Sequence, residues 1–249
     1  MGNSYKIIAI DESGKASFKH PSPEFLLSGL VISEKLLKKF DSDIKNIKKK
    51  FFKNPDIVFH CRDILRKKGK FSILLDPDIE EKFWNEFIKI ISISEISIIM
   101  TITDKNKARK IGWNDIAILK KSYAKVIENF TKSYLVNGKG KIIAESDPYQ
   151  DRYLLETHNR LQSIGLPSEG LSGFDYRNKM TSISLVNKLN FDSSIQTADN
   201  LAIMGRIFYN LKIRNVNIKK LSKTELKFKK LIDQKLSNSN NPSIFEILV

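Results

Sequence analysis

The stretch "IIAIDESGKASF", residues 7–18, joins an apolar run directly to two acidic residues. The apolar residues predict a short buried strand over residues 5–10, after which Asp11 and Glu12 follow. Ser13 and Gly14 then predict a turn into the next strand. Adjacent carboxylates at the end of a buried strand need a physical reason, because burial removes their hydration and strengthens their mutual repulsion.

The composition is that of a globular protein with a strong positive charge. The chain has 249 residues, enough for one large domain or two small ones, and 41% of them are hydrophobic, which excludes a largely disordered chain. A net charge of +15 favours an anionic partner, with nucleic acid first and a membrane surface second. The alternative is the Lys-, Ile- and Asn-rich composition of an AT-rich genome, which would give the same charge without such a partner.

The cellular location is indicated by what the sequence lacks. A single cysteine, Cys61, excludes an internal disulfide and a zinc site built on cysteine pairs, and it favours a reducing compartment. The first residues do not have the pattern of a signal peptide, and the apolar runs are shorter than a membrane span. We therefore expect a cytoplasmic protein with no membrane association.

Apolar periodicity predicts alternating strands and helices, which is typical of an α/β sheet. The expected strands cover residues 5–10, 25–33, 95–103, 141–144 and 182–190, and the expected helices cover 34–52, 77–91, 114–135, 149–163 and 195–211. The Lys48, Lys49 and Lys50 run is interpreted as a solvated helix face. Residues 165–173 are expected to be a loop, and 237–243 a flexible stretch. We predict one domain over 1–249, with a candidate insertion at 53–93 and a charged helical extension at 215–249.

Acidic residues follow two of the expected strands, and one more lies in the first turns of an expected helix. Asp11 and Glu12 follow the first strand, Glu145 and Asp147 follow strand 141–144, and Asp199 lies in the first turns of helix 195–211. Sites in open α/β sheets form at strand ends and adjoining helices, and carboxylates gathered there need a cation. Mg²⁺ and Mn²⁺ prefer oxygen ligands, and two such ions about 4 Å apart activate water for phosphodiester hydrolysis. The alternative for each acid is that it caps a turn or a helix.

Three motifs, in this order, resemble a prokaryotic family of unknown function with a ribonuclease H-like fold. They are "AIDESG" (9–14), "IIAESD" (142–147) and "FDSSIQTADNLA" (191–202). The family opens with a strand ending in Asp-Glu-Ser-Gly, and it closes with a Gln-x-Ala-Asp helix, matched here by Gln196, Ala198 and Asp199. The resemblance implies a mixed central sheet of ribonuclease H type, flanked by helices and carrying a helical insertion. It also implies that Asp11, Glu145 and Asp199 are ligands of a divalent metal.

The middle acid and one histidine leave alternatives open. Glu145 stands where aspartate is more usual in the family, so Asp147 is a second candidate metal ligand. Asp104, at the end of strand 95–103, is a third, because the middle acid often comes from a strand beside the first one in such sheets. His60, in "FHCRDI" (59–64), is a candidate catalytic residue, either as a proton shuttle or as a phosphate contact. The alternative for His60 is a packed or surface histidine.

The leading functional hypothesis is a nuclease, or a related phosphodiester-processing enzyme, that acts on DNA or RNA and depends on Mg²⁺ or Mn²⁺. In it Asp11, Glu145 and Asp199 hold the metal, a metal-bound water attacks phosphorus, and His60 is either a proton shuttle or a phosphate contact. One alternative is a protein that binds nucleic acid without catalysis on the same scaffold. Another, which rests on the family resemblance, is a defence or toxin protein whose action depends on a protein partner. A homo-oligomer is also compatible with the sequence.

Overall fold

The structure is a computed structural model that describes residues 4–166, 170–187, 189, 191–239 and 241–249. Its strands are β1 (Ser4–Ser13), β2 (Glu24–Ser33), β3 (Ser97–Asp104), β4 (Gly138–Glu145), β5 (Met180–Val186) and β6 (Ile244–Ile247). Its α-helices are α1 (Glu34–Phe52), α2 (Cys61–Arg66), α3 (Pro77–Ile91), α4 (Lys105–Lys110), α5 (Asp115–Tyr134), α6 (Asp151–Ile164), α7 (Gly173–Lys179), α8 (Ser193–Lys212) and α9 (Lys223–Leu236). Two 3₁₀ helices, η1 (Gly69–Leu75) and η3 (Ile218–Lys220), lie between them.

The strands form one mixed sheet in the order β5-β4-β1-β2-β3-β6. Of the three central pairings, β1–β2 and β2–β3 are antiparallel and β1–β4 is parallel. At the two ends of the sheet, β5 runs parallel to β4 and β6 runs parallel to β3. The predicted α/β class, a mixed central sheet flanked by helices, is therefore confirmed.

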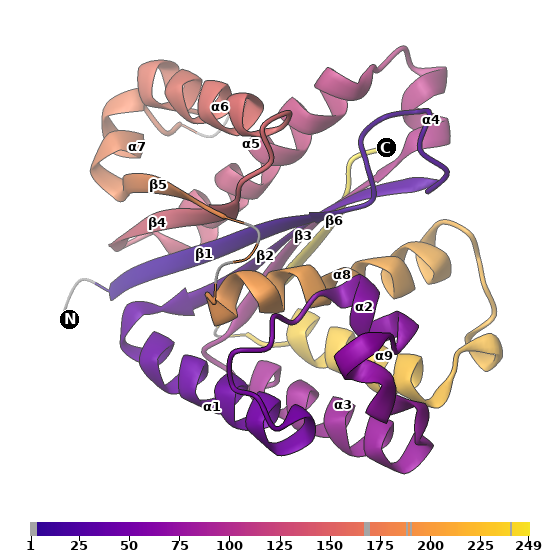
Figure 1. Ribbon diagram of the computed structural model, residues 1–249. Coiled ribbons are helices and arrows are strands. Elements are labelled where there is room, and N and C mark those ends of the chain that lie inside the picture. Colours follow the sequence, from indigo (N-terminus) through magenta and orange to yellow (C-terminus); the bar gives the residue numbers. More distant parts are fainter. Residues whose placement is uncertain (1–3, 167–169, 188, 190, 240) are drawn as a thin grey trace.

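Helices cover both faces of the sheet, and each face has its own hydrophobic core. One core lies between the sheet and helices α1, α3, α8 and α9, and the other lies between the sheet and helices α5, α6 and α7 (Figure 1). Segment 53–93 carries α2, η1 and α3, which add a cluster of phenylalanines and Trp84 to the first core. No helix in the described ranges has the length and apolarity needed to cross a membrane.

Side chains of β1 alternate between the two cores, as the pleat of a strand requires. Ile7 and Ala9 belong to the α8 side, whereas Ile8 and Ile10 belong to the α5 side. In β4, Ile143 lies on the α8 side and Ala144 on the α5 side. The face on which each acidic residue lies follows from this alternation.

The main correction to the expected elements concerns the first strand. The predicted strand ends at residue 10, but β1 continues to Ser13, so Asp11 and Glu12 lie within it. The reason is asymmetric pairing, because the β1–β4 ladder ends at Ile10 while the β1–β2 ladder continues to Ser13. Asp11 therefore lies one residue beyond the last pair with β4, but it is still paired with Ser28 of β2.

Smaller corrections concern the later part of the chain. Strand β5 covers Met180–Val186 instead of 182–190; residues 188 and 190 lie outside the described ranges. Helix α7 begins at Gly173, at the end of the expected loop. The C-terminal extension is helical only in part, because Ile244–Ile247 form β6 on the edge of β3. In the stretch expected to be flexible, the Ser243 hydroxyl oxygen accepts the backbone N–H of Ile98 at 2.9 Å.

The close approach of β4 to β1 gives a test of this packing. A Cβ atom at Gly140 would lie 2.6 Å from the carbonyl oxygen of Lys6, its partner in β1, and 2.9 Å from the Phe130 ring. We expect Gly140→Ala to lower the free energy of unfolding by about 1–3 kcal/mol, a typical cost of overpacking. Urea unfolding measures this, with Lys139→Ala, an exposed neighbour in the same strand, as the control. Equal stability of the two variants would contradict the described β1–β4 contact.

Candidate active site

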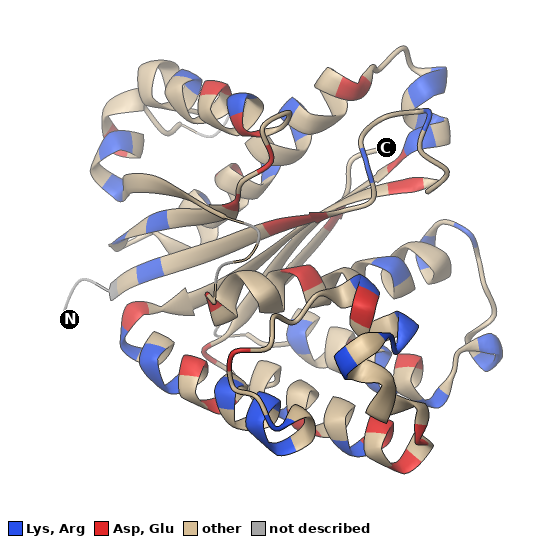
Figure 2. Cartoon of the chain, viewed as in Figure 1, with Lys and Arg blue, Asp and Glu red and all other residues tan. Residues whose placement is uncertain are grey.

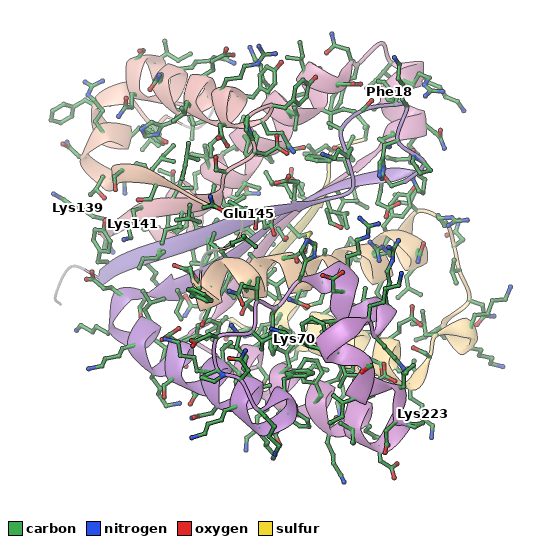
Figure 3. All side chains as sticks on the ribbon, in the orientation of Figure 1. Phe18, Lys70, Lys139, Lys141, Glu145 and Lys223 are labelled. Atoms are coloured by element: carbon green, nitrogen blue, oxygen red, sulfur yellow. The ribbon has the colours of Figure 1, made fainter. Side chains whose placement is uncertain are left out.

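Asp11 and Glu145 lie next to each other at the end of the β1–β4 ladder. The last pair in that ladder is Ile10 with Ala144, so the two acidic residues occupy the next positions of adjacent parallel strands. By the alternation of each strand, both side chains belong to the face that α8 covers. Figure 3 labels Glu145 near the middle of the view, at the opposite end of β4 from Lys139.

Helix α8 is attached to the sheet beside these acidic residues. Ser28 is the β2 partner of Asp11, and its hydroxyl is completely buried. This hydroxyl donates to the backbone carbonyl of Ala198 at 2.7 Å. Since Asp199 is the next residue of α8, the contact places this part of the helix backbone beside the pair of Ser28 and Asp11.

The environment of Asp11 shows that the acidic side chains interact. Burial raises the pKa of the Asp11 carboxyl well above its usual range, and the charges of Glu12, Asp199 and Glu145 act in the same direction. The backbone N–H of Glu12, which donates to Asp11 Oδ1 at 2.7 Å, opposes this shift. The charges of acidic residues from β1, β4 and α8 therefore all act on the Asp11 carboxyl.

The side chains of these acidic residues, as the structure describes them, are not arranged around a metal ion. In the part of the chain that the structure describes, no group of three or more His, Cys, Asp or Glu side chains is placed to hold a metal ion. The donor atoms are nevertheless carboxylate oxygens, which suit Mg²⁺ and Mn²⁺, and a cation would relieve the repulsion around Asp11. The residues therefore fit such an ion by charge and donor type, and ligation would require their side chains to rotate toward it.

Asp147 has a different local role from Glu145. Its Oδ1 accepts the backbone N–H of Tyr149 at 2.9 Å in the turn that leads into α6. Its other carboxylate oxygen lies 3.9 Å from the ammonium of Lys15. These contacts are those of a turn-forming aspartate, and Asp147 is not among the charges that shift Asp11.

Asp104 lies farther along the sheet. It caps α4, where its Oδ1 accepts the backbone N–H of Lys107 at 3.0 Å, and it also accepts the hydroxyl of Tyr209 at 3.1 Å. The β3 residue in the row of Asp11 and Ser28 is Met100, four residues before Asp104. At about 3.3 Å per residue, Asp104 is displaced by about 13 Å along the strand. Of the three rivals for the middle acid, Glu145 is the one in the same row as Asp11.

Glu12 lies on the opposite face of the sheet from Asp11, because neighbouring residues of a strand alternate. Its Oε1 accepts the side-chain N–H of Gln150, the residue that precedes α6, at 2.8 Å. The charge of Glu12 still acts on Asp11, but its side chain is tied to the α6 side. This arrangement is consistent with the view that Asp11, rather than Glu12, is the central acid.

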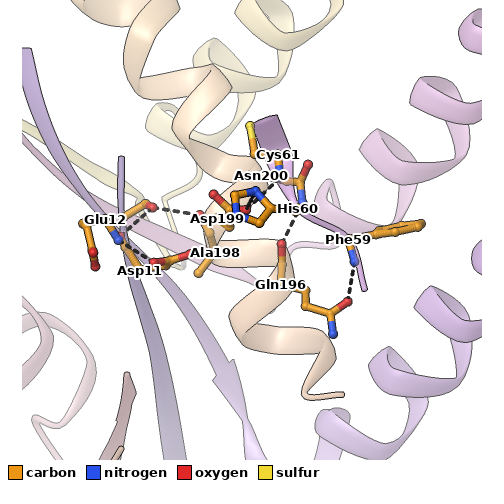
Figure 4. A network of polar contacts seen from close by, with 10 residues as sticks. Asp11, Glu12, Phe59, His60, Cys61, Gln196, Ala198, Asp199 and Asn200 are labelled. Carbon is orange, nitrogen blue, oxygen red and sulfur yellow. Dashed lines mark hydrogen bonds and ion pairs between the residues drawn. The ribbon is translucent and has the colours of Figure 1, made fainter. Parts of the chain in front are cut away.

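His60 lies beside Asp199, although the two are far apart in the sequence. Asp199 comes 138 residues after Cys61, which follows His60 directly. The ring Nδ1 is 3.4 Å from Asp199 Oδ2, and the backbone N–H of Cys61 donates to the same oxygen at 2.7 Å (Figure 4). The His60 side chain is 37% exposed, yet its Nδ1 is buried, so the accessible part of the ring is the side that carries Nε2. Burial raises the pKa of the Cys61 thiol, which keeps it protonated and unsuited to nucleophilic catalysis.

The interpretation of Lys48 as part of a solvated helix face is wrong. Lys49 and Lys50 are exposed, but Lys48 is only 1% exposed, and its ammonium donates to Gln196 Oε1 at 2.7 Å. Burial lowers the pKa of Lys48 to about 8. A signal was present in the sequence, since Lys48 lies four residues after Ile44 and three before Phe51, on the buried stripe of α1.

Comparison with protein-family models finds no match to this chain, and comparison with curated protein sequences finds none either. The resemblance to the ribonuclease H-like family thus rests on the motifs themselves. The residues of those motifs occupy one region of the structure: Asp11 and Glu145 are neighbours in the sheet, and Asp199 lies on the helix above them.

The raised pKa of Asp11 gives a testable pH dependence. Because the folded-state pKa exceeds the unfolded value of about 3.9, the folded protein binds more protons, and stability falls as the pH rises through the folded-state pKa. Asp11→Asn removes the charge and keeps an oxygen that can accept the Glu12 N–H. In EDTA, we expect this variant to melt at a higher temperature than the wild type at pH 7, with a smaller difference near pH 4.

The matched control is Asp147→Asn, which removes a partly exposed carboxylate from a turn and should give no such gain. If the wild type melted at or above the temperature of Asp11→Asn at both pH values, the description of a repulsive carboxylate cluster would be wrong.

Proposed function

We propose that the chain has a ribonuclease H-like fold and is a divalent-metal-dependent nuclease. One observation carries the proposal: Asp11 and Glu145 are adjacent in register on parallel strands, and their charges act together with that of Asp199 on the covering helix. The strand order is compatible with the fold, since β1, β2 and β3 form a consecutive antiparallel set and β4 and β5 follow in parallel on the other side of β1.

The residues divide into two roles in this proposal. Asp11, Glu145 and Asp199 would hold Mg²⁺ or Mn²⁺, which when bound supplies an activated water and charge stabilisation at the phosphate. His60 acts in proton transfer, because its ring presents the Nε2 side to solvent while Nδ1 lies buried, 3.4 Å from Asp199 Oδ2. In hydrolysis the water oxygen would bond to phosphorus as the phosphorus–oxygen ester bond breaks. His60 would take the proton from the attacking water, and the leaving oxygen would take a proton from solvent.

The charge distribution supports a polyanionic substrate. The chain carries 43 Lys and Arg residues against 28 Asp and Glu residues. Basic positions occur on helices of both layers, while the acidic stretch of β1 lies in the middle of the sheet (Figure 2). The excess of positive charge attracts the phosphate backbone that the carboxylates alone would repel. DNA and RNA both carry this backbone, so both are candidate substrates.

The nuclease proposal predicts cleavage of nucleic acid that depends on Mn²⁺ or Mg²⁺ and on the acidic residues of the cluster. We expect Asp11→Asn, Glu145→Gln and Asp199→Asn each to reduce the cleavage rate by about 100-fold or more, because each removes a charged oxygen ligand. Gel assays with single-stranded and duplex DNA, RNA and hybrids measure this. The control is Asp147→Asn, which should retain the wild-type rate.

Cleavage that survives Asp11→Asn unchanged would contradict the assignment of the cluster. Equal losses in Asp147→Asn and Glu145→Gln would contradict the choice of Glu145 as the middle acid.

A second candidate function is binding of nucleic acid without catalysis. The observation that favours it is that no three metal-ligating side chains within the described ranges are already in place for an ion. Binding of this kind would be strong at low salt, weaken steeply as salt increases, and persist in EDTA. Fluorescence anisotropy with labelled oligonucleotides in EDTA and in Mn²⁺, run beside the cleavage assay, distinguishes the two functions.

A further inference from the structure

Two backbone amides of the segment before α2 donate to side chains of α8. The N–H of Phe59 donates to Gln196 Oε1 at 2.9 Å, and the N–H of Cys61 donates to Asp199 Oδ2 at 2.7 Å. Gln196 and Asp199 are three residues apart, so they lie on one face of the helix. The two contacts flank His60, the residue between Phe59 and Cys61 (Figure 4).

Lys48 completes this arrangement from a third element, α1. Its ammonium donates to the same Gln196 Oε1 at 2.7 Å and lies 5.0 Å from the centre of the Phe59 ring. A glutamine amide presents oxygen or nitrogen depending on its partners. Two donors on one atom therefore fix the amide with its oxygen toward Phe59, which is the orientation that the Phe59 N–H requires.

The cost of burying Lys48 argues against a purely stabilising role. The side chain lies among the apolar residues of α1 and is 1% exposed. Removal of an ammonium from water is costly, and replacement of a buried charge by an apolar residue of similar size is often neutral or stabilising. An apolar residue would suit this position of the helix, but it could not orient Gln196.

We propose that Lys48 and Gln196 are positioning residues that, together with Asp199, clamp segment 59–61 so that His60 is held beside the carboxylate cluster. Asp199 thus serves the cluster and the clamp at once. The catalytic consequence rests on the proposed nuclease function, whereas the clamp itself is a property of the fold. In this view the Gln-x-x-Asp spacing of α8 matches the spacing of the two amides on either side of one histidine.

Hydrogen exchange and kinetics test the clamp separately. Lys48→Met keeps an unbranched side chain and removes the donor, Gln196→Leu removes the acceptor, and Gln196→Glu keeps an acceptor for both donors. Lys49→Met is the control, because Lys49 is the exposed neighbour of Lys48. We expect amide exchange of Phe59 to accelerate at least about tenfold in Lys48→Met and Gln196→Leu, but not in Gln196→Glu or Lys49→Met.

Under the nuclease proposal, the same two variants should lose about 10- to 100-fold in kcat with little change in KM, the usual cost of removing an outer positioning contact. Gln196→Glu should retain most of the rate. Unchanged Phe59 exchange in Lys48→Met and Gln196→Leu would overturn the clamp. Faster exchange with an unchanged kcat would overturn its role in positioning His60. A wild type without nuclease activity would refute the proposed function, and the exchange data would still decide on the clamp.

Discussion

The parallel pairing of β1 with β4 ends at Ile10 and Ala144, and the candidate site depends on where this ladder ends. One residue beyond it, Asp11 and Glu145 occupy neighbouring positions on the face covered by α8. A shift of one residue in this pairing would move one of the two carboxylates to the other face of the sheet. The register of two central strands therefore decides whether the acidic residues meet.

The second constraint is the position of α8 on the sheet. The buried hydroxyl of Ser28, the residue paired with Asp11, donates a hydrogen bond to the Ala198 carbonyl. The same helix carries Gln196 and Asp199, which hold the two amides around His60. One helix thus connects the carboxylates of the sheet with the histidine of a segment that lies far away in the sequence. Burial raises the pKa of Asp11, the neighbouring negative charges raise it further, and a cation would oppose both effects.

Local patterns in the sequence were enough to predict the α/β class, the main helices and the acidic residues at β1, β4 and α8. They could not predict that β1 continues through Asp11, because the extra pairing comes from β2 and is not encoded in residues 5–10 alone. The four residues of β6 are too few for a periodic signal, and their partner β3 lies 140 or more residues earlier in the chain. The burial of Lys48 is predictable from its position on the apolar stripe of α1, whereas the charge of lysine alone predicts an exposed side chain.

If Asp11, Glu145 and Asp199 hold one divalent metal ion, anomalous diffraction from crystals soaked in Mn²⁺ should reveal it. We expect an anomalous peak between these three side chains, with carboxylate oxygens about 2.1 Å from the ion. The absence of a peak there at saturating Mn²⁺, or a peak held by Asp147 or Asp104 instead, would contradict it.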